Sequence, residues 1–326
     1  MVLQGESLAH RTFAGLPALL QKGDVLVLNE TRVIAARLVG RRASGGFAEL
    51  LLLHPAGSLT YDPTANAWMA LARPARRLRA GDRIEFGEYG EAAVLAAHPE
   101  GLREIEFRLR VPFEEFLESA GQMPLPPYIR NDVPEARERY QTVFARTPGS
   151  VAAPTASLHF TAELLEEVAR RGVEIVRLSL NVGLGTFRPL SAESIDDHVM
   201  HAEAYEIPTA VGNAIEAART QQRRIVAAGT TTVRALEGNV AAFGRIRPGR
   251  RETDVFITPG FRFRVVDAMI TNFHLPRSTL LMLVSAFAGR ERILAAYREA
   301  IARRYRFYSF GDAMFITKGN DALRDV

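Results

Sequence analysis

The sequence predicts an α/β protein: a main domain with a mostly parallel sheet, interrupted by a smaller inserted β-barrel domain. Between about residues 44 and 130, short apolar or alternating stretches lie close together with Gly, Pro and Asp between them, which is typical of a small antiparallel barrel. Beyond this segment, strand-like and helix-like stretches alternate. A buried strand is predicted ahead of the barrel, so residues 1–43 and 131–326 are expected to form one discontinuous domain around an inserted domain at 44–130.

The first part of the chain predicts a short helix and two extended segments. LPALLQKG at 16–23 favours a helix that ends at Gly23, and the apolar run VLVLN at 25–29 predicts a buried strand. ETRVIAARLVG continues as a second extended run. In the inserted segment the expected strands are AELLLL, AWMALA, DRIEFG, EAAVLAA and REIEFRLR. MPLPPYI at 123–129 is too rich in proline for a helix or a central strand, so it marks the exit from the barrel.

The remainder of the chain predicts alternating helices and strands. Thr161 is placed to cap a helix over AELLEEVARR, and Gly172 follows that helix. VEIVRLSL at 173–180 and RRIVAAG at 223–229 predict strands, and a helix is expected near 209–221. DVFITPG and FRFRVV predict two further strands. RILAAYREAI predicts a helix, because apolar or aromatic residues recur in it at helical spacing. These are Ile293, Leu294, Tyr297 and Ile301.

Residues 259–289 contain a polar cluster between two apolar runs. The cluster consists of Thr271, Asn272 and His274. Ser278 or Thr279 can cap the helix that follows from about Leu280, and Gly289 can end it in a left-handed conformation. That helix, LLMLVSAFA, is apolar on all sides and far shorter than a membrane span, so we expect it in the core of a soluble domain. The polar cluster is either a rigidly held binding or catalytic loop or a hydrogen-bonded turn at the edge of the core.

Composition excludes several kinds of site. The 326 residues include no cysteine, which excludes disulfides, cysteine nucleophiles and thiolate-bound metals. The net charge is +4, and nearly all positive charge is on arginine, since Lys22 and Lys318 are the only lysines. Two basic runs, at 73–83 and 245–252, are compatible with phosphate binding, although such runs are more often solvated loops. The sequence shows no signal peptide and no membrane-length apolar run, so we expect a soluble cytoplasmic protein.

Two glycine-containing segments follow predicted strands: NVGLGTF at 181–187 and AAGTTTVRALEG at 227–238. Glycine lets a ligand approach the main chain, and a helix N-terminus offers free N–H groups to a carboxylate or phosphate. Neither segment has the spacing of a dinucleotide fingerprint or a P-loop, so each is compatible both with ligand binding and with an ordinary tight turn.

Histidines and a carboxylate offer a third kind of site. DDHVMHAE places His198, His201 and Glu203 in one short segment, which could bind a divalent metal or supply proton-transfer groups. We expect no metal, because these residues do not share a helical face and no second ligand cluster is present. His159 precedes Thr161 and could belong to the helix cap or to the wall of a pocket. The lack of a G-x-S-x-G motif argues against a Ser-His-Asp hydrolase.

Several segments, taken together and in order, resemble one family of tRNA-modifying enzymes. They are VLVLNETRVIAARL, MPLPPYI, RYQTVFA, GSVAAPTASLHFT, NVGLGTFRPL, HVMHAE, GTTTVRALE, VDAMITNFHLPRSTLLMLVSAFAGRE and YRFYSFGDAMFI. Through these segments, nearly the whole chain is similar to the S-adenosylmethionine:tRNA ribosyltransferase-isomerase family of queuosine biosynthesis. Asn181 stands where that family usually has His, Ser157 replaces a Gly, and the family pattern has a further N-terminal segment ahead of HRTF.

The resemblance implies a fold, a reaction and partners. The implied fold is an α/β domain interrupted by a smaller β-barrel, without a metal and with S-adenosylmethionine as a co-substrate rather than a recycled cofactor. The implied reaction transfers and isomerises the ribosyl group onto the 7-aminomethyl-7-deazaguanine wobble base of tRNA, giving epoxyqueuosine-tRNA, adenine and methionine. We expect a monomer that binds tRNA and S-adenosylmethionine. The alternatives are a non-catalytic RNA-binding protein of the same fold and an S-adenosylmethionine-dependent RNA methyltransferase.

The implied reaction needs a general base, because a sulfonium acidifies the neighbouring C5′ protons. The candidates are His274, His201 and Glu203, with His159 behind them. S-Adenosylmethionine is expected to contact Gly183, Gly185, Thr186, Phe187, Gly229, Thr230, Thr231, Arg234, Asn272 and Phe273. The tRNA is expected to contact Asn29, Thr31, Arg32, Tyr140, Gln141, Thr142, Pro154 and Thr155. Asn272 and His274 should face the ligand, whereas residues 280–287 should face the core.

Overall fold

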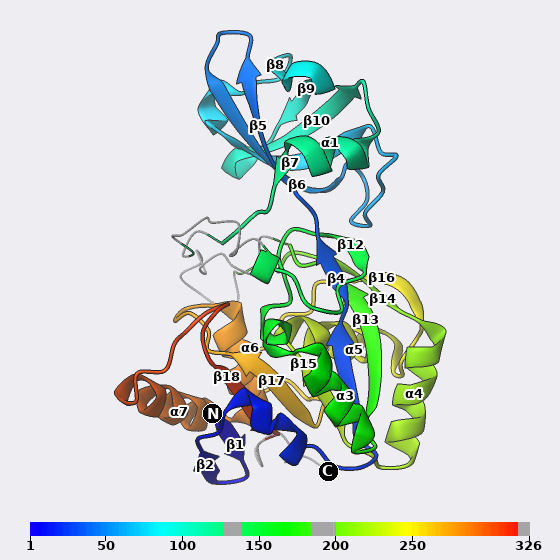
Figure 1. The fold of residues 1–326 in the computed structure, drawn as a ribbon, viewed down its shortest axis with the longest axis vertical. Coiled ribbons are helices and arrows are strands. Elements are labelled where there is room, and N and C mark those ends of the chain that lie inside the picture. Colours follow the sequence, from blue (N-terminus) through cyan, green and yellow to red (C-terminus); the bar gives the residue numbers. More distant parts are fainter. Residues whose placement is uncertain (127–128, 130–137, 184–197, 199, 319–326) are drawn as a thin grey trace. The chain divides into compact units, whose positions relative to one another are not determined.

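The computed structural model describes residues 1–126, 129, 138–183, 198 and 200–318 (Figure 1). The chain divides into two compact units. The main domain comprises Met1–Thr31, Gln141–Arg146 and Pro154–Val326, and the barrel domain comprises Arg32–Tyr140 and Thr147–Ala153. The expected boundary at residue 44 differs from this division, because strand β5 (Arg37–Arg42) pairs with strand β6 (Phe47–Pro55) of the barrel.

The described part of the main domain contains one nine-stranded sheet. Its strands are β1 (Val2–Gln4), β2 (Ser7–Ala9), β3 (Val25–Asn29), β13 (Glu174–Leu180), β14 (Glu203–Ile207), β15 (Ile225–Ala228), β16 (Gly249–Thr253), β17 (Ala268–Asn272) and β18 (Ala313–Thr317). Their order is β16-β14-β13-β3-β15-β17-β18-β1-β2 (Figure 1). The central strands β13, β3, β15 and β17 are parallel neighbours, as predicted, and antiparallel pairs on both sides make the whole sheet mixed.

Helices cover both faces of this sheet. They are α3 (Ala162–Arg170), α4 (Thr209–Thr220), α5 (Thr230–Phe243), α6 (Thr279–Ala288) and α7 (Arg290–Ala302), with the 3-10 turns η1 (Phe13–Ala18) and η5 (Thr155–His159). Leu26 and Leu28 of β3 lie in one buried cluster with Leu165 of α3. Val25 and Val27 alternate with them, point to the other face and are fully buried. Because β3 is covered on both faces, its sequence is a continuous apolar run.

Two helix starts confirm the predicted caps. Thr161 Oγ1 accepts the N–H of Leu164 at 3.2 Å, and Ser278 Oγ accepts the N–H of Leu281 at 3.2 Å. Gly289 lies between α6 and α7. Its φ of 91° is positive, which favours glycine at this position.

Some predicted elements differ from the structure. The strands expected at 254–260 and 261–266 do not form. Instead, the carboxylate of Glu237 on α5 accepts the N–H groups of Arg264, Val265 and Val266 at 2.8 to 2.9 Å, so these donors have a side-chain partner and join no strand ladder. Ile301, expected on the apolar face of its helix, is 65% exposed at the end of α7. Within α6, residues 280–282 are partly exposed, whereas Leu283, Val284 and Phe287 are buried as expected.

The barrel domain is a closed antiparallel barrel filled by its own side chains. Its further strands are β7 (Ala67–Arg73), β8 (Arg83–Glu85), β9 (Gly90–Ala97), β10 (Leu102–Leu109) and β11 (Gly121–Gln122), with the turns η2 (Ala75–Arg77), η3 (Gly87–Tyr89) and η4 (Pro99–Gly101) and the helix α1 (Phe113–Ala120). The strand order β5-β6-β7-β10-β9-β8 closes into a barrel because β8 also pairs with β5. A Cβ on Gly40 of β5 would lie 2.5 Å from Ile84 Cγ2 of β8, so only glycine leaves room for this close approach. Trp68 stacks on Phe113 inside, with ring centroids 4.9 Å apart. The predicted α/β fold with an inserted barrel is therefore confirmed. Strands β4 (Thr31–Val33) and β12 (Thr147–Ser150) form a separate two-stranded sheet.

Candidate active site

Polar residues gather at one edge of the main sheet. The carboxyl ends of β13, β3, β15 and β17 meet at this edge, because the four strands are parallel. Asn29 ends β3, Asn272 ends β17, and Gly229 follows β15 at the start of α5. Ligands of open α/β sheets bind at such strand ends, so this edge is the candidate active site.

Asn29 ties three elements together at this edge. Its Oδ1 accepts the N–H groups of Leu180 at 3.0 Å and Thr31 at 3.1 Å. Its Nδ2 donates to the carbonyl of Leu180 at 3.0 Å and to Thr231 Oγ1 at 3.4 Å. The side chain is fully buried. Asn29, expected among the substrate-binding residues, therefore holds β3, β13 and the start of α5 in register.

Helix α5 begins at this edge with three buried threonines, residues 230–232. Gly229 makes the turn from β15 with a φ of 93°, and its N–H donates to the carbonyl of Ile270 at 2.8 Å. The N–H groups of the first helical turn have no acceptor within the helix, and the helix dipole makes this end positive. The start of α5 is therefore suited to bind a carboxylate or a phosphate.

A buried ion pair supports the same helix start. Glu203 of β14 and Arg234 of α5 are 4% and 2% exposed, and Arg234 Nη1 donates to Glu203 Oε2. Glu203 Oε1 accepts the N–H of Gly183 at 3.0 Å, and Arg234 Nε donates to the carbonyl of Val255 at 3.3 Å. Arg234 Nη2 is buried without an acceptor among the described residues. The pair therefore holds the segment after β13. It leaves one nitrogen of the guanidinium, Nη2, to which a bound anion can accept a hydrogen bond.

Asn272 links the end of β17 to His159. Its Nδ2 donates to the carbonyl of Tyr308 at 3.1 Å and lies 3.3 Å from His159 Nε2, and its Oδ1 accepts from Thr155 Oγ1 at 3.4 Å. Because the carbonyl acceptor orients the amide, its nitrogen faces the ring, and His159 Nε2 is the accepting nitrogen. Burial lowers the pKa of His159 below its ordinary value of 6.5. The imidazole is therefore neutral at pH 7, with its basic nitrogen toward Asn272.

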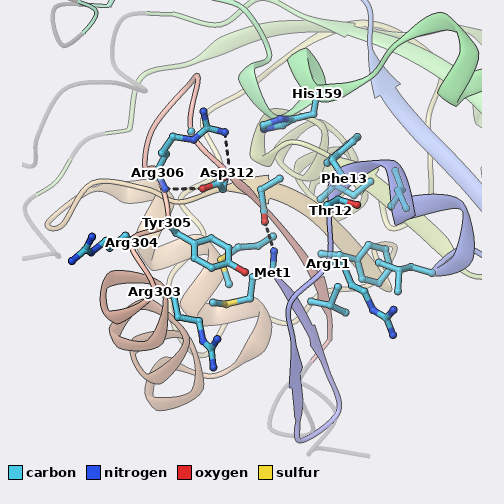
Figure 2. A pocket seen from close by; sticks show the side chains of 18 residues that line it. Met1, Arg11, Thr12, Phe13, His159, Arg303, Arg304, Tyr305, Arg306 and Asp312 are labelled. Carbon is cyan, nitrogen blue, oxygen red and sulfur yellow. Dashed lines mark hydrogen bonds and ion pairs between the residues drawn. The ribbon is translucent and has the colours of Figure 1, made fainter.

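His159 also lines a pocket of about 480 Å³ in the main domain (Figure 2). Phe13 stacks on its imidazole with ring centroids 5.0 Å apart. Apolar side chains contribute much of the lining, among them Val2, Leu16, Ile270, Met314 and Phe315. Charged residues also line it, namely Arg11, Arg303, Arg304, Arg306 and Asp312. This volume lies in the range of small-molecule sites. Apart from His159, sequence reasoning assigned these residues no role. Arg306, Asp312, Met314 and Phe315 lie in the family-like segment YRFYSFGDAMFI, but the other lining residues come from distant parts of the chain.

His274 and Phe273 are held inside the domain. His274 Nε2 lies 2.8 Å from Thr271 Oγ1, and the main-chain N–H of His274 donates to the hydroxyl of Tyr297 at 2.8 Å. Burial lowers the pKa of His274 to about 4. Phe273 is fully buried and packs edge-on against Tyr305, with ring centroids 5.5 Å apart. The aromatic side chains of α7 and of the segment before β18 therefore enclose Phe273, whereas the side chain of His274 is partly exposed and its Nε2 is held by Thr271.

The other expected site residues are spread over both domains. His201 is exposed, and Thr31 Oγ1 donates to Asn181 Oδ1 at 2.9 Å. Arg32 and Tyr140 belong to the barrel domain. The residues that belong to the main domain are Gln141, Thr142, Pro154 and Thr155. Those that lie outside the described residues are Gly185, Thr186 and Phe187.

Two further features concern the described residues only. Within them, no group of three or more His, Asp or Glu side chains is arranged to hold a metal ion. In the same part of the chain, no helix combines the length and the apolar character that crossing a membrane requires.

Comparison with known proteins agrees with the sequence motifs. A family model described as "Queuosine biosynthesis protein" matches residues 1–316. The S-adenosylmethionine:tRNA ribosyltransferase-isomerase of Symbiobacterium thermophilum is 53% identical over 312 residues, which cover 95% of this chain and 89% of the relative. The protein of the same name from Gloeobacter violaceus is 50% identical over 323 residues, which cover 99% and 90%. The S-adenosylmethionine tRNA ribosyltransferase of Thermotoga maritima, a solved structure, is 35% identical and aligns with a TM-score of 0.52 over 97% of this chain and 91% of that chain. The chain therefore belongs to the queuosine biosynthesis protein family.

Proposed function

We propose that this protein transfers and isomerises the ribosyl moiety of S-adenosylmethionine onto the 7-aminomethyl-7-deazaguanine wobble base of tRNA. Epoxyqueuosine-tRNA, adenine and methionine are the products. Family membership supports the class of reaction. The single observation that carries the proposal is that the N-terminus of α5 and the neutral imidazole of His159, beside Asn272, lie at one edge of the sheet.

The reaction requires three things of the protein. The sulfonium makes the ribose C5′ protons acidic and makes methionine a good leaving group. A base removes a C5′ proton, the electron pair forms a C4′–C5′ double bond as the C4′–O4′ bond breaks, and the ring oxygen becomes a C1′ carbonyl as adenine leaves C1′ and takes up a proton. The aminomethyl nitrogen of the wobble base adds to C4′ and loses a proton, and C5′ bonds to the C1′ carbonyl to close a carbocycle. The resulting alkoxide attacks C5′, which closes the epoxide and expels methionine. The protein must therefore supply a base, bind the methionine carboxylate, and position the aminomethyl group.

His159 is the best placed of the four candidate bases. Its imidazole borders the pocket (Figure 2) and is neutral at pH 7. Its accepting nitrogen, Nε2, faces Asn272 Nδ2 at 3.3 Å, so this nitrogen takes the C5′ proton once the substrate replaces the amide as its partner. Glu203 is committed to its buried ion pair, and His274 Nε2 is hydrogen-bonded to Thr271 Oγ1. The exposed imidazole of His201 has no neighbour that would orient it among the described residues. We therefore assign the base to His159 and a positioning role to Glu203.

The start of α5 is assigned to the methionine carboxylate. The free N–H groups near Thr230 and Thr231 and the positive end of the helix dipole favour an anion there. Arg234, one helical turn further along α5, adds a charged donor, because its Nη2 is buried without an acceptor among the described residues. Binding the carboxylate at this point keeps the amino acid part of S-adenosylmethionine at the same sheet edge as Asn272.

Adenine release tests the proposed function. The protein is incubated with S-adenosylmethionine and tRNA that carries the aminomethyl precursor, and the products are identified by mass spectrometry. We expect adenine, methionine and epoxyqueuosine-tRNA in equal amounts. S-Adenosylhomocysteine as the product would instead show methyl transfer. Retained tRNA binding without adenine would show a non-catalytic RNA-binding protein.

The assignment of the base is tested separately by single-turnover kinetics. His159→Ala should slow adenine release by about 10² to 10⁴-fold, the usual contribution of a general base. His98→Ala, which removes an exposed imidazole from the barrel domain, is the matched control and should keep the parent rate. In the parent protein, the acid limb of the pH profile should lie below pH 6.5, because burial lowers the pKa of His159. A normal rate for His159→Ala would remove this residue from the mechanism.

A further inference from the structure

The basic run at 73–83 forms an ordered loop on the barrel domain. The side chain of Leu78 is fully buried and anchors the loop. The N–H of Arg79 donates to Asp82 Oδ2 at 2.7 Å, and the N–H of Gly81 donates to the carbonyl of Val94 at 2.8 Å. The main chain of the loop is therefore held in place from several sides.

A buried arginine organises the same loop. Arg103 of β10 is 7% exposed, and its Nε donates to the carbonyl of Leu78 at 2.6 Å while its Nη2 donates to that of Ala75. Its Nη1 donates to the carbonyls of Leu102 at 2.6 Å and His98 at 3.1 Å. Among the described residues, no carboxylate lies within ion-pair distance of this guanidinium. Arg103 therefore joins the basic loop to the turn between β9 and β10 through main-chain carbonyls alone.

The loop presents charge that the described part of the chain does not neutralise. Arg76, Arg77 and Arg79 are exposed, and no carboxylate of the described residues pairs with them. Keeping three guanidiniums together on a fixed main chain has a cost in mutual repulsion. An anionic partner would remove this cost, and the ordered main chain lowers the entropy lost when the partner binds.

The second basic run, at 245–252, differs in this respect. Arg250 pairs with Glu206 at 2.8 Å, and the guanidinium of Arg251 lies over the ring of Phe243, 4.7 Å from its centroid. These arginines are used within the main domain. The partners of the side chains thus distinguish two runs that look alike in sequence.

We propose that Arg76, Arg77 and Arg79, here called the arginine loop, bind the phosphodiester backbone of tRNA, and that Arg103 is the positioning residue that holds them. Arginine binds phosphate through two parallel N–H groups. The loop has no exposed large apolar or aromatic side chain to insert into a lipid surface, which favours RNA over a membrane. Backbone contacts carry no sequence information, so the loop contributes affinity rather than recognition of the wobble base. This inference rests on the proposed action on tRNA.

The salt dependence of tRNA binding tests the proposal. Each phosphate contact contributes about 0.7 to 0.9 to the slope of log affinity against log salt concentration. The triple variant R76Q/R77Q/R79Q should therefore bind precursor tRNA with a slope shallower by about 2 to 3, and about tenfold or more weakly at low salt. The KM for tRNA should rise, and the KM for S-adenosylmethionine should not change. Fluorescence anisotropy of labelled tRNA over a series of KCl concentrations measures both slope and affinity.

A charge-matched control separates local contacts from net charge. R219Q/R250Q/R290Q removes three arginines that form ion pairs in the main domain, so it lowers the net charge equally. This control should keep the parent slope. A control that loses as much slope as the arginine-loop variant would overturn the proposal, because general charge would then explain both.

Arg103 is tested by its own variants. Arg103→Met should reduce the slope as the triple variant does, and Arg103→Lys should not restore it, because a single ammonium cannot reach the carbonyls that the guanidinium joins. Trp68, inside the barrel, reports by fluorescence whether each variant remains folded. If Arg103→Met unfolds the barrel, the triple variant decides the proposal.

Three outcomes would distinguish the possible failures. If the parent protein releases adenine and binds tRNA, but the triple variant keeps affinity and slope, the arginine loop is not a tRNA contact while the proposed function stands. If the triple variant keeps tRNA binding and loses binding to vesicles of phosphatidylglycerol and phosphatidylcholine, the loop serves a membrane surface and the proposal is wrong. Failure of the parent protein to bind precursor tRNA would reject the proposed function and this inference together.

Discussion

Replacing Glu203 by Gln should destabilise the main domain and leave the barrel domain unchanged. The carboxylate of Glu203 and the guanidinium of Arg234 are both buried and joined directly, and Glu203 also accepts the N–H of Gly183. Gln keeps the shape but removes the negative charge, so Arg234 stays buried without a compensating carboxylate. Breaking a buried pair in this way costs about 3 to 5 kcal/mol.

The expected loss can be measured domain by domain. The only tryptophan, Trp68, lies in the barrel, so its fluorescence follows that domain, whereas far-ultraviolet circular dichroism follows both. With a urea dependence of about 1 to 3 kcal/mol per M, the loss should lower the midpoint of the main-domain transition by about 1 to 5 M. The Trp68 transition should keep its midpoint.

A double-mutant cycle gives the matched control. Replacing both partners, as Glu203→Leu with Arg234→Met, removes both charges and should cost far less than the sum of the two single changes. The reasoning is refuted if Glu203→Gln changes the free energy of unfolding of the main domain by less than about 1 kcal/mol, or if the two single changes are additive.

Three further predictions concern single side chains in the main domain. Burial lowers the pKa of His274 from 6.5 to about 4, so protonation favours the unfolded chain. Stability should therefore fall by about 3 kcal/mol as the pH drops through this interval, and His274→Gln should remove that dependence in urea unfolding at pH 7 and pH 4. Gly238→Ala should destabilise by about 1 to 3 kcal/mol in thermal unfolding, because the new Cβ would lie 2.2 Å from Thr253 Oγ1. Ser157→Ala should leave the melting temperature unchanged or higher, because the buried hydroxyl has no hydrogen-bond partner among the described residues.

Each of these predictions has a contradicting result. Equal acid sensitivity of the parent and His274→Gln would show that this imidazole is protonated without strain in the folded state. A Gly238→Ala variant as stable as the parent would show that α5 and β16 have room between them. A loss of more than about 1 kcal/mol in Ser157→Ala would mean that the hydroxyl has a partner in the folded protein.

Much of the fold followed from local patterns in the sequence. The run at 25–29 is apolar because its strand is covered on both faces. In the inserted segment, apolar and polar residues alternate because one face of each strand points into the filled interior of the barrel. The strands predicted at 254–260 and 261–266 failed for a non-local reason. Glu237, on a helix earlier in the chain, supplies the acceptors that a neighbouring strand would otherwise provide.

The candidate site could be predicted only in part. The resemblance pointed to Asn29, Glu203 and Asn272. Asn29 and Asn272 end the strands β3 and β17, and Glu203 begins β14, which is antiparallel to β13 and so reaches the same edge of the sheet. The sequence could not rank the histidines, because protonation and access depend on what surrounds each ring. Thr271 holds the Nε2 of His274, whereas His159 lies on a pocket wall.

The sequence by itself determined the α/β class, the inserted barrel, the family and the helix caps, because these depend on spacing and on residue types that are neighbours in the chain. Tertiary structure decided the roles of the side chains. His159 meets Asn272 across 113 positions of the chain, and Asn29 meets Thr231 across 202. Likewise, the two basic runs are similar in composition but differ in their contacts. Arg250 of the run at 245–252 pairs with Glu206 within the main domain, whereas the main chain of the run at 73–83 is bound by the buried Arg103. Contacts between residues so distant in the chain exist only after folding, so no local pattern can encode which charge is satisfied and which is free to bind.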